Sequence, residues 1–138
     1  MMPDPMPLSQ MPPDLAAITA LAEHALATIP AKLRALLPNI SIAVEEMPDD
    51  ETLAAMGIDN AWELTGLYHG TPLPQRSVDD IARPPDQVTL YRQPILLEWI
   101  ETAVDLADLV RTVLIHEIAH HFGFSDAEIE VLEERGKD

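Results

Sequence analysis

The sequence predicts a single α+β domain, built from several helices and a few short strands. Residues 40–45 and 88–91 each alternate apolar with polar side chains, which is the pattern of a half-buried strand. Residues 106–122 instead repeat apolar side chains at helical spacing and form the longest predicted helix. With 138 residues and no internal repeat, the chain has the size of one ordinary domain.

The N-terminal residues are expected to lie outside this domain. Residues 1–13 are rich in proline and have few side chains to bury, which predicts a flexible tail before a domain at residues 14–138. The tail lacks the apolar segment of a signal peptide. No run of about 18 apolar residues is present, so we expect no membrane association and a cytoplasmic location.

Two helical segments are predicted to open the domain. Asp14 can cap a helix that directs apolar side chains such as Ile18 toward a core. Pro30 breaks or kinks this helix, and one or two further turns are expected up to Pro38. His24, on the first helix, is expected at the surface.

The middle of the chain is predicted to contain short elements separated by turns. After the strand at residues 40–45, Asp50 begins a short helix that Gly57 can end. A second strand is predicted at residues 65–69. Residues 71–86 contain several prolines and are expected to form a long loop, which is uncommon in a compact domain unless the loop has a function.

The C-terminal half is predicted to be mostly helical. Pro94 suits the first turn of a helix that runs through Trp99. Asp105 can cap the long helix at residues 106–122, and Gly123 can end it because glycine tolerates a positive φ.

A capping box predicts one more helix. Ser125 and Glu128 have the spacing at which each side chain bonds to the backbone N–H of the other. This helix should reach about Glu134, and its acid-rich surface from residue 128 to residue 134 is interpreted as a solvated face.

The charge and the absence of cysteine exclude several kinds of site. The chain has 24 acidic and 8 basic residues, which gives a formal net charge of −16 at pH 7. Such a surface repels phosphate, so we expect no nucleic-acid partner. Because there is no cysteine, a transition metal would have to be held by histidines and carboxylates.

The long predicted helix carries the pattern His-Glu-Ile-Ala-His at residues 116–120. Residues four apart on a helix lie on one face, so His116 and His120 can both bind one zinc ion. Glu117 lies beside that ion without ligating it, where it can take a proton from an attacking water. The spacing therefore predicts a zinc site with one ion per chain.

A third ligand is predicted beyond the end of this helix. Gly123 can reverse the chain and bring the following residues back toward the two histidines. Asp126 then supplies a carboxylate oxygen and leaves the fourth zinc position for water, as a catalytic site requires.

The whole string HEIAHHFGFSD, from His116 to Asp126, resembles the HExxHxxGxxD signature of small bacterial zincin-like metallopeptidases. The resemblance extends to residues 37–46, 64–76 and 88–96. It implies a minimal zincin-like fold, in which a small mixed β-sheet packs on the active-site helix that carries HExxH. The chain is similar, less closely, to metzincins, which have a third histidine at the position of Asp126.

These features together predict a zinc-dependent metallopeptidase that hydrolyses peptide bonds with a zinc-activated water and Glu117 as general base. The substrate is expected to be a peptide or protein that adds as a strand to an exposed sheet edge, for which residues 88–92 are the candidate. Tyr68, His69 or Tyr91 are candidates to stabilise the oxyanion. Nothing in the pattern indicates the oligomeric state.

Two other functions are compatible with parts of the motif. A zinc-containing binding protein without catalytic activity would use the same metal ligands. A metal-dependent endoribonuclease of the ribosomal-RNA maturation type would have a similar ligand spacing. Glu117 and the acidic net charge both argue against the endoribonuclease.

Some of the candidate residues also have simpler interpretations. His121 lies about 100° around the helix from His120 and cannot bind the same metal, so a structural or supporting role is expected. Tyr68, Tyr91 and Trp99 are more typical of aromatic side chains in or at the edge of a core than of residues in a functional site.

Overall fold

The computed structural model describes residues 11–37, 39–70 and 86–135. The predicted tail at residues 1–13 and the predicted loop at residues 71–86 lie almost entirely outside these ranges, so both stay predictions. In chain order the elements are α1 (Leu15–Ala27), α2 (Ala31–Arg34), β1 (Ile40–Glu45), α3 (Asp50–Met56), the 3-10 helix η2 (Ala61–Glu63), β2 (Gly66–His69), β3 (Asp86–Tyr91), α4 (Arg92–Thr102), α5 (Leu106–His121) and α6 (Asp126–Arg135).

The helix boundaries follow local capping interactions, as predicted. The Asp14 carboxylate accepts a hydrogen bond from the backbone N–H of Ala17, and Asp105 accepts one from Asp108. Gly57 and Gly123 follow α3 and α5 with φ of +67° and +82°, a conformation in which a Cβ would be strained.

The capping box before α6 is also confirmed. The Ser125 N–H donates to Glu128 Oε1 at 3.1 Å, and the Glu128 N–H donates to Ser125 Oγ at 3.2 Å. These two bonds fix the direction in which α6 leaves the turn.

The strands form a small mixed sheet in the order β1-β3-β2. Strand β3 pairs in parallel with β1, with Val88 opposite Ile42, and in antiparallel with β2, with Val88 opposite Tyr68. The α+β class and the mixed sheet are therefore confirmed.

The prediction that residues 88–92 form a sheet edge is wrong, because β3 is the central strand and α4 begins at Arg92. Thr89, which reads as a solvent-facing residue in the sequence, is almost completely buried between the apolar residues Val88 and Leu90. Its hydroxyl accepts a hydrogen bond from the Gln87 side chain at 3.1 Å. A threonine with such a partner fits a central strand as well as an edge.

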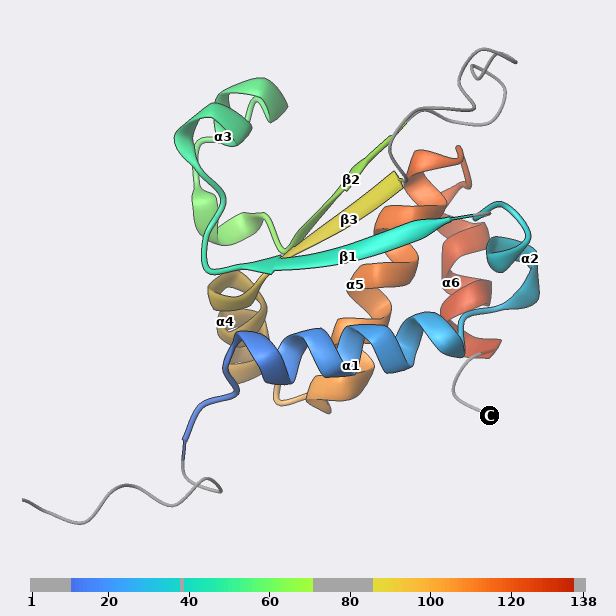
Figure 1. Ribbon diagram of the computed structural model, residues 1–138, viewed down its shortest axis with the longest axis horizontal. Coiled ribbons are helices and arrows are strands. Elements are labelled where there is room, and N and C mark those ends of the chain that lie inside the picture. The colour runs from blue at the N-terminus through green and yellow to red at the C-terminus, as the bar shows by residue number, and fades with distance from the viewer. Residues whose placement is uncertain (1–10, 38, 71–85, 136–138) are drawn as a thin grey trace, which may run out of the picture.

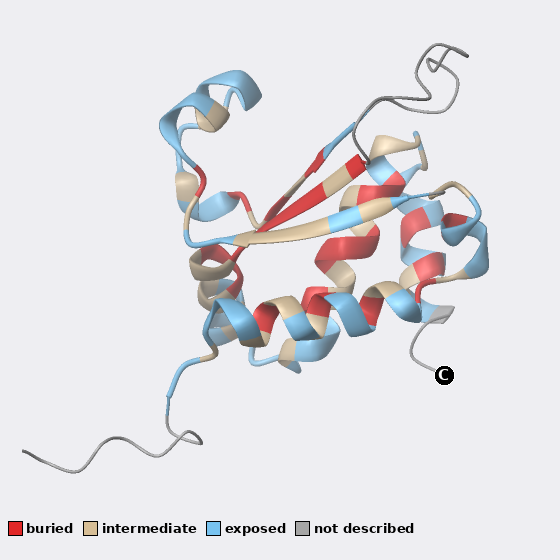
Figure 2. Ribbon diagram, viewed as in Figure 1, coloured by how far each residue is buried: buried red, intermediate tan, exposed pale blue. Residues whose placement is uncertain are grey.

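Helices α1 and α5 form the layer that covers the sheet, and they also contact each other (Figure 1). Buried residues gather along β3 and α5 (Figure 2). Helix α3 projects from the end of the domain opposite to α6 and contains no buried residue. The largest fully buried side chains include Ile18, Leu33, Leu90, Ile95, Leu114, Ile115, Ile118 and Ile129. The core therefore holds α5 rigidly against the sheet.

Helix α4 keeps Pro94 in its first turn, as predicted, but continues past Trp99 to Thr102. No helix in the described part of the chain combines the length and the apolar character that a bilayer crossing requires.

Candidate metal centre

His116 and His120 lie one turn apart near the C-terminal end of α5. The core side of the helix carries Leu114 and Ile118, which are fully buried. The two histidines lie on its more exposed side, with ring centroids 4.4 Å apart. The sequence placed them on one face, and the packing of α5 leaves that face accessible.

The turn after α5 brings a carboxylate back to these rings. The N–H groups of Gly123 and Phe124 donate to the carbonyls of His120 and Ala119, each at 3.0 Å, which closes the end of the helix. The next helix then begins with Asp126, whose Oδ1 lies 3.2 Å from Nε2 of His120. Its side chain is 90% exposed, so the carboxylate can adjust to a ligand.

The three predicted ligands form a group with the dimensions of a metal site. One ligand atom from each of His116, His120 and Asp126 lies within 4.8 Å of the other two. Two atoms that each bind a tetrahedral zinc at about 2.0–2.1 Å lie roughly 3.4 Å from each other. Small side-chain rotations would therefore bring the three ligand atoms to the spacing of a zinc site. Two imidazoles with one carboxylate are also a donor set that suits zinc.

Glu117 lies beside this group, in the contact between α5 and β2. Burial raises the pKa of its carboxyl above 4.5, and the nearby imidazoles of His116 and His120 oppose that rise. A Cβ added to Gly66 of β2 would come within 3.2 Å of the Glu117 Cγ and 3.0 Å of Val113. The glycine thus lets β2 approach α5 closely, which partly buries Glu117.

One functional candidate was missed from the sequence. Glu133 of α6 places its Oε1 3.4 Å from Nδ1 of His116. The interpretation of residues 128–134 as a purely solvated face is therefore wrong. Ile129 and Leu132 are buried in the core, and the Glu133 side chain is only 23% exposed.

The sequence does contain a signal for the direction of Glu133, which is its spacing of seven residues from Asp126. Residues seven apart lie on nearly the same side of a helix. If Asp126 faces the histidines, Glu133 lies on the same side of α6 two turns later, and the packing of α6 along α5 then decides whether it reaches them.

Tyr68 lies on the α5 side of β2, but its hydroxyl is engaged in the described structure. It donates to Asp86 at 2.6 Å, and its ring stacks on His121 at a centroid distance of 3.8 Å. His121 is thereby placed against β2 and outside the ligand group, as the sequence predicts.

The other two oxyanion candidates point away from the ligands. Neighbouring side chains in a strand face opposite sides, so His69 is directed away from α5 where Tyr68 faces it. Tyr91 is buried near Thr52 of α3, and burial together with the charges of Glu45 and Asp49 raises its pKa. The structure does not bring His69 or Tyr91 to the three ligands.

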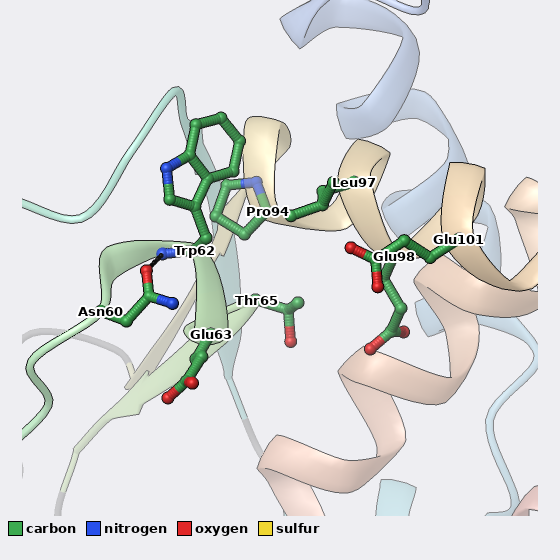
Figure 3. A pocket seen from close by; sticks show the side chains of 8 residues that line it. All are labelled: Asn60, Trp62, Glu63, Thr65, Pro94, Leu97, Glu98 and Glu101. Atoms are coloured by element: carbon green, nitrogen blue, oxygen red, sulfur yellow. Dashed lines mark hydrogen bonds between the residues drawn. The ribbon is translucent and has the colours of Figure 1, made fainter.

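A separate cavity of about 420 Å³ lies between η2 and α4 (Figure 3). The Trp62 indole and the carboxylates of Glu63, Glu98 and Glu101 are among its lining groups. The Asn60 Oδ1 accepts a hydrogen bond from the backbone N–H of Trp62 at 3.1 Å. It contains none of the three candidate ligands, so it is distinct from the metal centre.

The family described as zincin-like metallopeptidase matches residues 37–136, which include the sheet and all the side chains of the candidate centre. No curated protein matches the chain.

Proposed function

This chain belongs to the zincin-like metallopeptidase family, and we propose that it is a zinc-dependent peptidase. The observation that carries the proposal is the convergence of His116, His120 and Asp126 beside the carboxylate of Glu117. Three ligands and one neighbouring base are what metal-assisted hydrolysis of an amide requires.

His116, His120 and Asp126 would hold the metal. When bound, zinc acts as a Lewis acid on the scissile carbonyl and on the attacking water. The two imidazoles are fixed by α5, whereas Asp126 follows a turn and is exposed, so it is the most adjustable of the three ligands.

Glu117 would move the proton. Partial burial raises its pKa, which makes its carboxylate a stronger base than that of an exposed glutamate. It would take one proton from water and later deliver it to the nitrogen of the departing amine. That transfer leaves a free carboxylate and a free amine as products.

Strand β2 is the favoured position for the substrate backbone. In the described sheet β2 lies at an edge beside β3, and an extended peptide that added there would continue the sheet by one strand. Gly66 of β2 lies against Glu117, so a peptide added along this edge would pass close to the base. This placement replaces the edge that the sequence suggested at residues 88–92.

The test compares the wild type with Glu117→Gln on a diverse peptide library. The wild type should bind zinc stoichiometrically and cleave peptides, and a chelator should abolish the cleavage. Glu117→Gln should keep the zinc and lose at least about 100-fold in rate, since a general base contributes that much or more. Glu130→Gln, at an exposed position of α6, is the matched control and should behave as the wild type.

Other outcomes point to other functions. Wild-type cleavage rates in Glu117→Gln would remove that residue from the mechanism. Stoichiometric zinc without chelator-sensitive cleavage of any peptide would favour the zinc-containing binding protein. Cleavage of RNA under the same conditions would favour the endoribonuclease.

A further inference from the structure

Helix α6 directs two carboxylates at two histidines of α5. It runs back along α5 after the turn at Gly123, so residues later in α6 lie beside residues earlier in α5 (Figure 1). Asp126 therefore meets His120, and Glu133, seven residues later, meets His116. The two carboxylates differ in exposure, with side chains 90% and 23% exposed respectively.

The two carboxylates also face different ring nitrogens. Asp126 approaches Nε2 of His120, whereas Glu133 approaches Nδ1 of His116. A neutral imidazole carries its proton on one nitrogen and a lone pair on the other. An acceptor at Nδ1 therefore favours the tautomer in which Nε2 is free to bind a metal.

We propose that Glu133 is a positioning residue, which accepts the Nδ1–H of His116 and so orients that ring with Nε2 toward the metal. Carboxylate partners of this kind fix the tautomer and ring orientation of metal-binding histidines and raise their basicity. The inference rests on the metal site of the proposed function, and it assigns Asp126 and Glu133 different roles.

The backbone of Glu133 is held in place independently of His116. Its neighbour Leu132 is buried in the core, as is Ile129 one turn earlier. Its carbonyl accepts a hydrogen bond from Nη1 of Arg111, which extends from α5, at 3.4 Å. A carboxylate on so constrained a backbone can orient a neighbouring ring, which a freely moving surface glutamate could not do.

The first measurement is the zinc affinity of the full-length chain, by competition with a chelator of known affinity. Glu133→Ala should bind zinc roughly 10–100-fold more weakly than the wild type, the effect typical of losing an outer partner of a ligand. Glu133→Gln should retain much of the affinity, because the amide oxygen still accepts the Nδ1–H. Glu134→Ala removes the exposed neighbouring acid and should leave the affinity unchanged.

The second measurement separates positioning from a merely structural role. In NMR spectra of the zinc-loaded protein with ¹⁵N-labelled histidine, the Nδ1–H of His116 should be protected from solvent exchange in the wild type and in Glu134→Ala. It should exchange rapidly in Glu133→Ala, although the zinc-free variant should unfold at nearly the wild-type temperature. Glu133→Met keeps a similar side-chain length but has no oxygen to accept the Nδ1–H, so it takes the place of the alanine variant if that variant does not fold.

The outcomes separate this inference from the proposed function. Wild-type zinc affinity in Glu133→Ala would overturn the positioning role and leave the metal site intact. A loss as complete as that caused by removing His120 would also overturn it, because Glu133 would then be a direct ligand. A wild-type protein that takes up no zinc would overturn the proposed function and this inference together.

Discussion

Helices α3 and α6 look alike in the sequence but differ in what they contribute. Both are short, both begin with an aspartate after a capping side chain, and both are acidic in their first turn. Helix α3 buries no residue and projects from the domain, whereas α6 packs Ile129 and Leu132 into the core. Only α6 therefore has a fixed face and can aim its carboxylates at other side chains.

An acidic helix can contribute to a functional site when one of its faces is packed in the core. A carboxylate on an unpacked helix is solvated and interacts weakly with any single partner. The same group two turns along a packed helix is held at one distance from its partner, as Glu133 is from His116. Three pairs of matched substitutions test this difference.

The largest effect is expected from the first aspartate of each helix. Asp126→Ala should weaken zinc binding by more than about 100-fold, exceeding the loss typical of an outer partner, because it removes a direct ligand. Asp50→Ala should leave zinc affinity unchanged, although it removes the same kind of side chain from the same helical position. Chelator competition measures both. Equal affinities in the two variants would mean that another group completes the metal site.

The next effect concerns the stability that packing gives to each helix. Leu132→Ala should lower the free energy of unfolding by about 2–5 kcal/mol, the usual cost of truncating a fully buried leucine. Leu53→Ala in α3, where the side chain is only partly buried, should cost less than about 1 kcal/mol. Urea denaturation of the zinc-free proteins gives both values, and similar losses would show that α3 is packed as firmly as α6.

The smallest effect is the pH dependence of the two caps. Hydrogen bonds with Ser125 lower the pKa of Glu128 below 4.5, and those with Thr52 lower the pKa of Asp49 below 3.8. A lowered folded-state pKa stabilises the protein above the unfolded-state value, and that contribution is lost as the pH falls through the folded-state value.

Urea midpoints of the zinc-free protein should therefore fall as the pH drops below 4.5, and this fall should be smaller in Glu128→Gln. Asp49→Asn should reduce only the part of the decline that begins below 3.8. Identical pH profiles for Glu128→Gln and the wild type would show that the capping box does not persist in solution.

Interactions between residues close in the chain were predictable. The caps at Asp14, Asp105 and Ser125, and the helix end at Gly123, each depend on groups within five positions of one another. Their energies are largely independent of the rest of the fold, so residue type and spacing suffice to predict them.

The position of β3 and the direction of Glu133 were not predicted. Both depend on elements far apart in the sequence, since β3 lies between β1 and β2, and Glu133 meets a residue 17 positions earlier. A half-buried pattern did not distinguish a central strand from an edge, because Thr89 could be buried with a side-chain partner.

The amino-acid sequence by itself determined the α+β class, the helix that carries His116, Glu117 and His120, and the turn that leads to Asp126. These follow from helical periodicity and capping, which act over a few residues. Tertiary structure alone decided which strand lies beside the base, how far Glu117 is buried and which carboxylate contacts Nδ1 of His116. Each of those depends on how the core packs α5 between β2 and α6, and packing is a property of the whole chain.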